Sequence, residues 1–426
     1  MDKNTPIYKT YVDILTRELV PAMGCTEPIA VAFCAARARD LLGKMPERVE
    51  IAASGNIIKN VKSVIVPHTG GMRGLEAAAA VGILYGRAER ALEVIAAVTQ
   101  EEERSLSDRI GELSISVKPL ESEHVLDLVI TLWAGEDSAA VRICDEHTNV
   151  TEIRKNGKSL PVSPAASTTE PEDEPDYGLL RVADIFDFAN TVDIEDVRAC
   201  LSRQIAYNRA IAEEGLQNPY GARIGQVISH RGGDVRTAAI ALSAAGSDAR
   251  MGGCDMPVVI VSGSGNQGMT ASLPVIAYAT YYQKDEEALL RALTLSNLVT
   301  LHLKRGIGRL SAYCGAVSAG AGAGAGIAYL MTGDLSVINH TVVNALAISS
   351  GIICDGAKAS CAAKIAMAVD AGIMGYEMYR EGCEFYGGEG LVSRGIENTI
   401  QNIYALGHDG MKETDKKIIE IMTGIC

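Results

Sequence analysis

An alanine- and glycine-rich run in the second half of the chain limits the possible folds more than any other feature. Residues 315–330 read GAVSAGAGAGAGIAYL, with five glycines and no charged side chain. Each glycine disfavours a helix by about 1 kcal/mol relative to alanine, so five of them persist only where another backbone or a cofactor comes very close. Aromatic residues make up only 5% of the chain. This combination favours closely packed helices over a β-sandwich.

The first 157 residues mix helical and strand patterns. Apolar spacing predicts a helix at 6–20, and an alanine-rich run predicts another at 75–85. Between them, Thr26 can cap a helix that has Glu27 and Pro28 in its first turn and runs to about residue 42. Alternating apolar runs predict strands at 49–53, 113–117, 125–133, 139–144 and 150–153, with residues 59–66 as a further element of the same sheet. We therefore expect an α+β domain at 1–157, a small antiparallel sheet with helices on one face.

A stretch rich in proline and acidic residues separates this domain from the rest. Residues 158–178 hold four prolines and five acids, the composition of a solvated linker. From residue 179 to residue 426 helical patterns dominate, without the strand–helix alternation that a large parallel sheet needs. The expected fold class is thus α+β, with a mostly α-helical C-terminal domain that contains buried glycine-rich helices.

The charge balance and the hydropathy exclude several partners. The chain has 39 basic and 53 acidic residues, a net charge of −14, so it repels phosphate backbones and is not expected to bind nucleic acid. Its first residues, MDKNTPIYKT, lack the apolar run of a secretory signal. The uncharged stretches 315–331 and 335–354 are too rich in glycine or polar residues for a membrane span. We expect a cytoplasmic protein whose ten cysteines are free thiols, metal ligands or nucleophiles.

Three cysteines lie in two of the more distinctive segments. Cys314 is in SAYCGAV, and Cys354 and Cys361 share IICDGAKASCAAK. Their spacings match neither the close pairs of zinc sites nor the ferredoxin pattern, and three core cysteines would look the same. Adjacent glycines or helix starts, with Lys358 and Lys364 nearby, favour accessible sulfurs with thiolate character. Core residues and metal ligands therefore both remain open.

Cys25, in PAMGCTEP, stands directly before a predicted helix. The partial positive charge of a helix N-terminus stabilises a thiolate. The position fits a base, a nucleophile or a metal ligand, and it equally fits an ordinary cysteine in a turn.

Two polar turns are candidates for ligand binding. The loop SGSGNQG at 262–268 follows an apolar run and precedes a helix, so its backbone N–H groups can form an anion site. Asn266 and Gln267 add amides that orient a small polar ligand. The second turn, SGNIIKN at 54–60, contains Lys59, a natural partner for a carboxylate. Each could also be a plain exposed turn.

Six phrases occur in a fixed order: PAMGCTEP, SGNIIKN, TGGMRG, SGSGNQG, IGRLSAYCG and ICDGAKASCAAK. Together they resemble the L-cysteine desulfidase family, a relative of the iron–sulfur L-serine dehydratases, over nearly the whole chain. The resemblance implies a [4Fe–4S] cluster held by Cys314, Cys354 and Cys361. It also implies that residues 1–157 correspond to the β-type domain of the dehydratases, and that the protein converts L-cysteine and water to pyruvate, sulfide and ammonia.

The same resemblance implies roles for other residues. Serine dehydratases carry Ser-Ser-His-Thr where this chain has Gly24-Cys25-Thr26, so Cys25 takes the place of the histidine expected to act as base. Its thiolate is expected to remove the Cα proton of the substrate, in a cleft between the two domains. Six side chains are expected to hold the carboxylate and the amine of the substrate: Lys59, Asn60, Ser262, Ser264, Asn266 and Gln267.

Two other functions fit the same residues. One is a dehydratase for L-serine or a related hydroxy amino acid, with the same cluster. The other is a non-catalytic cluster-bearing sensor or sulfur carrier, which the polar loop at 262–268 disfavours because a sensor needs no substrate loop. The alanine- and glycine-rich helices would suit a homodimer. Some serine dehydratases end in a cysteine that folds back onto the cluster, but we interpret Cys426 as incidental.

Overall fold

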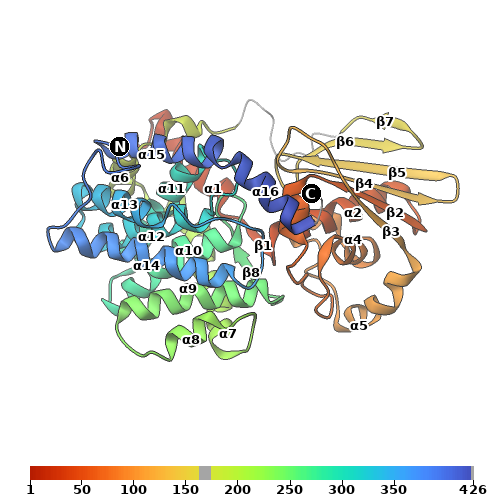
Figure 1. Cartoon of the computed structure of the whole chain (residues 1–426), viewed down its shortest axis with the longest axis horizontal. Coiled ribbons are helices and arrows are strands. Elements are labelled where there is room, and N and C mark those ends of the chain that lie inside the picture. The colour runs from red at the N-terminus through yellow and green to blue at the C-terminus, as the bar shows by residue number, and fades with distance from the viewer. Residues whose placement is uncertain (163–173, 424–426) are drawn as a thin grey trace.

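The computed structural model of the chain describes residues 1–162 and 174–423. Figure 1 shows two halves side by side, one built of packed helices and the other of helices on a β-sheet. Each half has its own large cluster of buried apolar side chains. The α+β fold class expected from the sequence is confirmed.

The sheet has six strands in the order β3-β2-β4-β5-β6-β7. They are β2 (Arg48–Ala53), β3 (Ser114–Pro119), β4 (Asp127–Ala134), β5 (Asp137–Cys144), β6 (Val150–Lys155) and β7 (Lys158–Leu160). Neighbours are antiparallel except β2 and β3, which run parallel because the chain between them crosses over through helices. Strand β7 occupies the start of the predicted linker 158–178, whose residues 163–173 lie outside the described part.

Helices cover one face of this sheet. α2 (Thr26–Leu42) and α4 (Gly74–Tyr85) pack against each other, and α2 also contacts β4 and β5. Leu128, Ile130 and Leu132 are fully buried and join the apolar cluster of these helices. Their spacing of two places them on the same face of β4, so the N-terminal half is a sheet with a helical layer.

The segment predicted at 59–66 as part of the sheet is helical at its start, so that prediction is wrong. α3 (Gly55–Val61) follows β2 directly, and α5 (Gln100–Arg109) lies further along the crossover. Ile57 and Val61 are both fully buried. Their separation of four residues is the spacing of one helix face, and this outweighs the β-branched composition of the segment.

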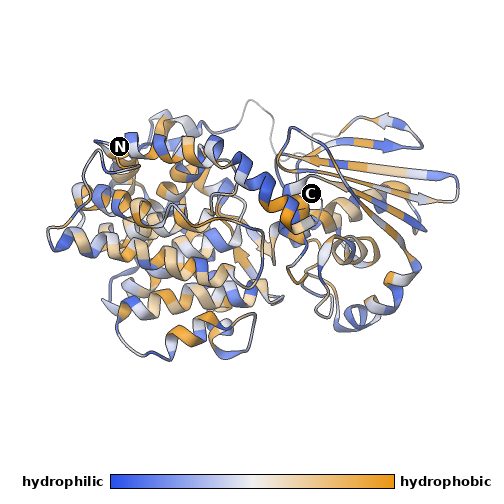
Figure 2. Cartoon of the chain, viewed as in Figure 1, coloured by the Kyte–Doolittle hydropathy of each residue, from blue (hydrophilic) through white to orange (hydrophobic). Residues whose placement is uncertain are grey.

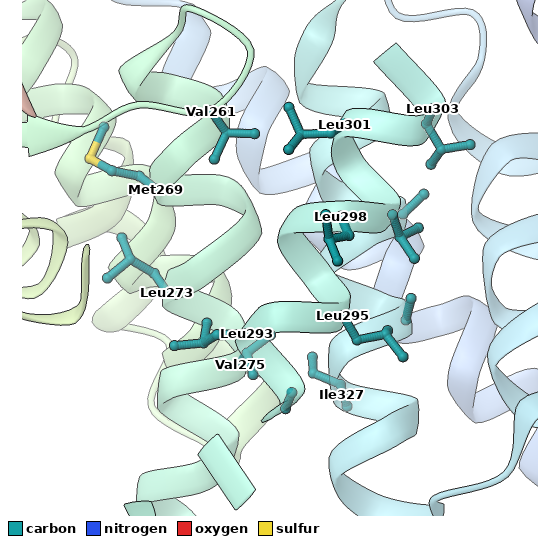
Figure 3. Close-up of a cluster of buried hydrophobic side chains, with 14 of the residues drawn as sticks. Val261, Met269, Leu273, Val275, Leu293, Leu295, Leu298, Leu301, Leu303 and Ile327 are labelled. Atoms are coloured by element: carbon teal, nitrogen blue, oxygen red, sulfur yellow. The ribbon is translucent and has the colours of Figure 1, made fainter. Parts of the chain in front are cut away.

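The C-terminal half consists of packed helices. They are α6 (Val182–Thr191), α7 (Ile194–Gln217), α8 (Ile224–Ser229), α9 (Val235–Met251), α10 (Gly265–Tyr281), α11 (Glu286–Arg305), α12 (Gly315–Thr332), α13 (Leu335–Ser349), α14 (Cys361–Arg380), α15 (Ile396–Tyr404) and α16 (Lys412–Thr423). Figure 3 shows Leu273 of α10, Leu295 and Leu298 of α11, and Ile327 of α12 in one apolar cluster. All four side chains are fully buried.

The glycines of α12 lie where neighbouring helices approach most closely. A Cβ on Gly320 would lie 2.3 Å from the carbonyl oxygen of Ala368, and one on Gly324 would lie 2.6 Å from that of Gly372, both on α14. On another side of α12, a Cβ on Gly322 would lie 2.1 Å from a side chain of α11. The expectation that other backbones come very close to this run is confirmed. Neither α12 nor any other helix in the described ranges is long and apolar enough to cross a membrane.

We expect Gly372→Ala to lower the free energy of unfolding by about 1–3 kcal/mol, the usual cost of overpacking a tight core. The added Cβ would lie 2.2 Å from the carbonyl oxygen of Gly320, so α12 and α14 would have to separate. Urea denaturation of both proteins measures the change. Gly351→Ala is the control, since no atom lies within 4 Å of its Cβ position. Equal free energies of unfolding for the two variants would show that α12 and α14 can separate without loss of stability.

Both ends of the chain pack against the half that is distant in sequence. Tyr8 and Tyr11 of α1 (Pro6–Glu18) place their rings edge-on to Phe188 of α6, with centroids 5.2 and 5.3 Å apart. At the other end, Asp415 of α16 lies 2.5 Å from Nζ of Lys59 on α3. Figure 2 shows α16 changing from hydrophilic to hydrophobic toward its end, where it meets the N-terminal half. The domain boundaries at 157 and 179 stay a prediction, with α1 and α16 each crossing between the halves.

A two-stranded sheet joins the halves at their junction. β1 (Pro21–Met23) pairs antiparallel with β8 (Pro257–Val259), and both strands lie between the halves in Figure 1. Because the strands are antiparallel, Met23 at the end of β1 pairs with Pro257 at the start of β8. The chain after β8 then turns back, so that a Cβ on Gly265 would lie 2.4 Å from Cγ2 of Val258. The strand pair and this turn together bring PAMGCTEP and SGSGNQG to one junction, although the two are far apart in sequence.

Candidate active site

A cavity of about 100 Å³ lies at this junction. Four helices begin at its wall: Cys25 is the N-cap residue of α2, Ser264 of α10 and Cys314 of α12, and Cys361 is the first residue of α14. Helix N-termini favour negative charge, so the wall suits thiolates or an anionic ligand. The side chains of the wall that carry chemistry are Cys25, Glu27, Asn60, Arg250, Ser264, Asn266, Gln267, Lys304, Arg309, Cys314, Cys354 and Cys361.

The structure brings Cys314, Cys354 and Cys361 to one cavity. The N–H of Cys314 donates to the carbonyl oxygen of Ile352 at 3.2 Å, and the N–H of Cys354 donates to that of Ala312 at 2.6 Å. These bonds hold the loop before α12 beside the loop before α14, although Cys314 and Cys354 are 40 residues apart in the sequence. Cys361 joins them because α14 starts directly after the second loop.

The three sulfurs disfavour one another as thiolates when no positive charge lies between them. Burial raises the pKa of Cys314 to about 12, and the neighbouring Cys354 and Cys361 add to this rise, because thiolates in one cavity repel each other. A bound metal group stabilises thiolates by its positive charge. Three sulfurs that face a shared cavity fit the ligand set of a [4Fe–4S] cluster with three protein ligands.

Ligand spacing also separates a cluster from a single ion. In the described part of the chain, two sets of three ligand atoms lie within 4.8 Å of one another: His124, Cys144 and Asp145, and His68, Glu103 and Asp255. The three cavity cysteines do not meet this single-ion spacing. Ligands of a cluster bind different irons, so a wider spacing suits a cluster better than a lone ion.

Cys25 is held as a thiol rather than a thiolate. It is 3% exposed, and its Sγ donates a hydrogen bond to Oε2 of Glu27 at 3.1 Å. Burial and the charge of Glu27 raise the pKa of Cys25 well above its usual value, and Arg250 opposes this. The sequence pointed to a thiolate stabilised by the helix N-terminus, but burial outweighs that effect here. A role in catalysis for Cys25 stays a prediction, with a different electrostatic basis.

Glu27 is the charged partner of Cys25. Burial alone would raise its pKa, but His147, followed by Cys25, lowers it to about 2. Nε2 of His147 lies 4.0 Å from Oε1 of Glu27, and Nδ2 of Asn60 donates to the same oxygen at 3.0 Å. Glu27 is therefore a fixed negative charge beside the thiol.

The loop at 262–268 contributes the start of α10 to the cavity. Oγ of Ser264 accepts a hydrogen bond from the N–H of Gln267 at 3.5 Å, an N-cap interaction, and Asn266 also lines the wall. A Cβ on Gly315 would lie 2.6 Å from Cδ of Gln267. Glycine directly after Cys314 thus allows the amide of Gln267 to lie against the start of α12.

Two of the predicted substrate-binding residues do not line this cavity. Nζ of Lys59 is 2.5 Å from Oδ1 of Asp415, and its side chain is 1% exposed, so α16 covers it and neutralises its charge. Ser262 has a positive φ of 49° at the loop's turn and lines a separate pocket. Asn60, Ser264, Asn266 and Gln267 do line the cavity.

Sequence reasoning missed four polar residues of this region: Glu27, His147, Arg250 and Lys304. Glu27 stands within the PAMGCTEP phrase, so its neighbour Cys25 was a signal that could have found it. Lys304 lines the cavity, and burial lowers its pKa to about 8. Arg250 ends a helix whose sequence gives no sign of the site, because its position depends on the packing of α9 against α10.

Comparisons with known proteins show the family to which the chain belongs. Residues 89–420 match the family model described as serine dehydratase alpha chain. The chain is 54% identical over 431 residues to a UPF0597 protein of Desulfitobacterium hafniense, covering 100% of this chain and 99% of the relative. It is 49% identical over 423 residues to a UPF0597 protein of Lachnoclostridium phytofermentans, covering 98% and 100%. The chain therefore belongs to the serine dehydratase alpha chain family and is a relative of the iron–sulfur serine dehydratases.

Proposed function

We propose that the protein is an iron–sulfur lyase that degrades L-cysteine to pyruvate, sulfide and ammonia by α,β-elimination. The observation that carries the proposal is the meeting of Cys314, Cys354 and Cys361 with Cys25 in one cavity. The first three fit the ligands of a cluster, and the fourth stands where serine dehydratases are expected to carry a histidine base. Membership of the serine dehydratase alpha chain family does not by itself identify the substrate. Specificity for L-cysteine is therefore part of this proposal.

The residues of the chain would divide the reaction between them. A [4Fe–4S] cluster with three protein ligands supplies a Lewis acid at its fourth iron. Sγ of Cys25, once deprotonated, accepts the Cα proton, and the electron pair left on Cα forms the double bond as the Cβ–S bond breaks. The products are sulfide and aminoacrylate, which tautomerises to an imine, and water hydrolyses the imine to pyruvate and ammonia.

The raised pKa of Cys25 has two opposite effects on this role. It makes the thiolate scarce at neutral pH, and it makes each thiolate a stronger base toward the weakly acidic Cα proton. The positive charge of Arg250 favours the thiolate, so the cavity itself limits how far the pKa rises.

An L-serine dehydratase is the second candidate, because the matching family model describes serine dehydratases. Elimination from serine would need the same cavity and would release water in place of sulfide. A sensor or sulfur carrier is less well supported, since a cavity with Ser264, Asn266 and Gln267 on its wall is more than a carrier needs.

Anaerobically purified protein, supplied with iron and sulfide, should release sulfide and pyruvate in equal amounts from L-cysteine. We expect kcat/KM for L-cysteine to exceed that for L-serine by at least about tenfold, a difference of about 1.4 kcal/mol in the barrier. Sulfide and pyruvate are measured colorimetrically in parallel. Faster release of pyruvate from L-serine would reverse the assignment, and no turnover of either amino acid by iron-loaded protein would reject a lyase acting on them.

A further inference from the structure

The cavity has three cationic side chains on its wall, and two of them already have partners. Nζ of Lys304 donates to the carbonyl oxygen of Gly308 at 2.5 Å. Nη2 of Arg309 pairs with Glu146 at 2.8 Å and lies 3.6 Å from Glu18. The charge of Arg309 is thus balanced by carboxylates, and the ammonium of Lys304 is bound to the backbone.

Arg250 differs from both. Its Nε donates to the carbonyl oxygen of Gly24 at 2.8 Å, but its Nη2 is buried and has no hydrogen-bond partner. The residue is 2% exposed, and in the described ranges no carboxylate forms an ion pair with it. An unpaired buried charge is costly, and an unused buried donor adds to that cost. A ligand that supplies a carboxylate would remove both penalties.

The position of Arg250 is fixed by its surroundings. A Cβ on Gly265 would lie 2.5 Å from Nε of Arg250, so the guanidinium lies against the first residue of α10. The bond to Gly24 ties it to the residue before Cys25. The guanidinium is therefore held between the residue before the proposed base and the first residue of α10.

Acceptors without partners lie in the same cavity. Oδ1 of Asn60, Oδ1 of Asn266 and Oε1 of Gln267 are buried and accept no hydrogen bond in the structure. An ammonium group has three donors and no acceptor, and it is complementary to amide oxygens. A guanidinium is complementary to a carboxylate. The unsatisfied atoms of the cavity are thus the complement of a zwitterion.

We propose that Arg250 binds the α-carboxylate of the substrate, and that the amide oxygens of Asn60, Asn266 and Gln267 accept hydrogen bonds from its α-ammonium group. The site would then select free α-amino acids and reject ligands that lack either charge. This inference rests on the proposed function, and it names how that function recognises its substrate class. Recognition of the side-chain heteroatom of the substrate would depend on the part of the cavity formed by the cysteines.

The first test uses wild-type holoprotein and three ligands that cannot undergo elimination. L-Alanine carries both charges, ethylamine lacks the carboxylate, and propionate lacks the ammonium group. None has a side-chain heteroatom, so differences between them report on recognition of the two charges alone. We expect L-alanine to bind at least about 100-fold more tightly than either of the others, measured anaerobically by calorimetry and as inhibition constants. Equal affinities for L-alanine and ethylamine would overturn the role of Arg250.

The second test replaces Arg250 and asks whether the loss depends on the ligand's carboxylate. Arg250→Lys and Arg250→Met should raise the dissociation constant of L-alanine by roughly 10- to 100-fold, the usual effect of losing a charged hydrogen bond, and leave that of ethylamine unchanged. A purely structural role would weaken both ligands together, and that result would reject the proposal. Arg209→Met is the control, because Arg209 is half exposed and pairs with Glu213 on α7. If the Arg250 variants do not fold, the wild-type series decides alone.

The two proposals fail in different ways. If the loaded protein eliminates neither sulfide nor water from amino acids, but L-alanine binds and depends on Arg250, the function is wrong and the recognition is right. If sulfide is released from L-cysteine and the Arg250 variants keep the wild-type KM, the function stands and the assignment of Arg250 is wrong.

Discussion

Replacing Cys314, Cys354 or Cys361 with alanine will remove bound iron and lyase activity together. A cluster with three protein ligands loses a third of its protein anchoring with each substitution, so the metal-bound state becomes less favourable relative to the metal-free state. We expect turnover to fall by at least about 10³-fold, since Lewis-acid stabilisation is worth several kcal/mol. Iron and sulfide counted per chain after anaerobic preparation, together with the brown colour, report the cluster independently of activity.

Two controls separate loss of the cluster from general damage. Cys383 is exposed and lies outside the cavity, so Cys383→Ala should keep both iron and turnover. Cys34 is a fully buried cysteine of α2 that lies outside the cavity wall, and Cys34→Ala tests the effect of removing a buried sulfur. If a Cys354→Ala protein retained the wild-type iron content, Cys354 would not be a ligand, and the metal centre would have to be reassigned.

Cys25→Ala has the second largest expected effect. This variant should keep the iron content of the wild type and lose turnover by roughly 10²- to 10⁴-fold, the usual contribution of a general base. The separation between iron and activity is the essential result, because it distinguishes a base from a ligand. A colourless Cys25→Ala protein would identify Cys25 as a fourth ligand and leave the reaction without its proposed base.

The pH profile gives an independent test of the same role. Burial and Glu27 raise the pKa of Cys25, and the thiolate is the active form of a base. Activity should therefore be low at neutral pH and rise steadily as the pH increases toward that raised pKa. Glu27→Gln removes the negative charge beside the thiol, so the rise should move to lower pH. An unchanged profile in Glu27→Gln would indicate that another group takes the proton.

Much of the fold could be predicted from the sequence, because the signals for most helices and strands are local. The start signals at Thr26, Glu27 and Pro28 located α2, although the N-cap residue is Cys25, and the alternating runs located β2, β4 and β5. The glycines of α12 indicated close helix contacts, which the backbone of α14 supplies. The parallel pairing of β2 and β3 was not predictable in this way, because it depends on the crossover between them and not on either strand.

The residues of the site also differ in whether a local sequence signal could predict them. The phrases that carry Cys25, Asn60 and Cys314 could be recognised as motifs, and the structure brings these residues to one cavity. Lys59 also stands in a motif, yet α16 occupies its ammonium group through Asp415. Arg250 lies in an ordinary helical sequence. It reaches the cavity only because α9 packs against the start of α10, where Gly265 leaves room for the guanidinium. Long-range contacts of this kind leave no periodic trace in the sequence.

The ion pair between Lys59 and Asp415 joins residues 356 positions apart. At roughly 5–20 residues per second on the ribosome, roughly 20 to 70 seconds pass between the synthesis of the two. Until α16 emerges, the amine of Lys59 is a cation without this carboxylate partner. The contact between α3 and α16 therefore forms only at the end of synthesis, and the N-terminal half must fold first without it.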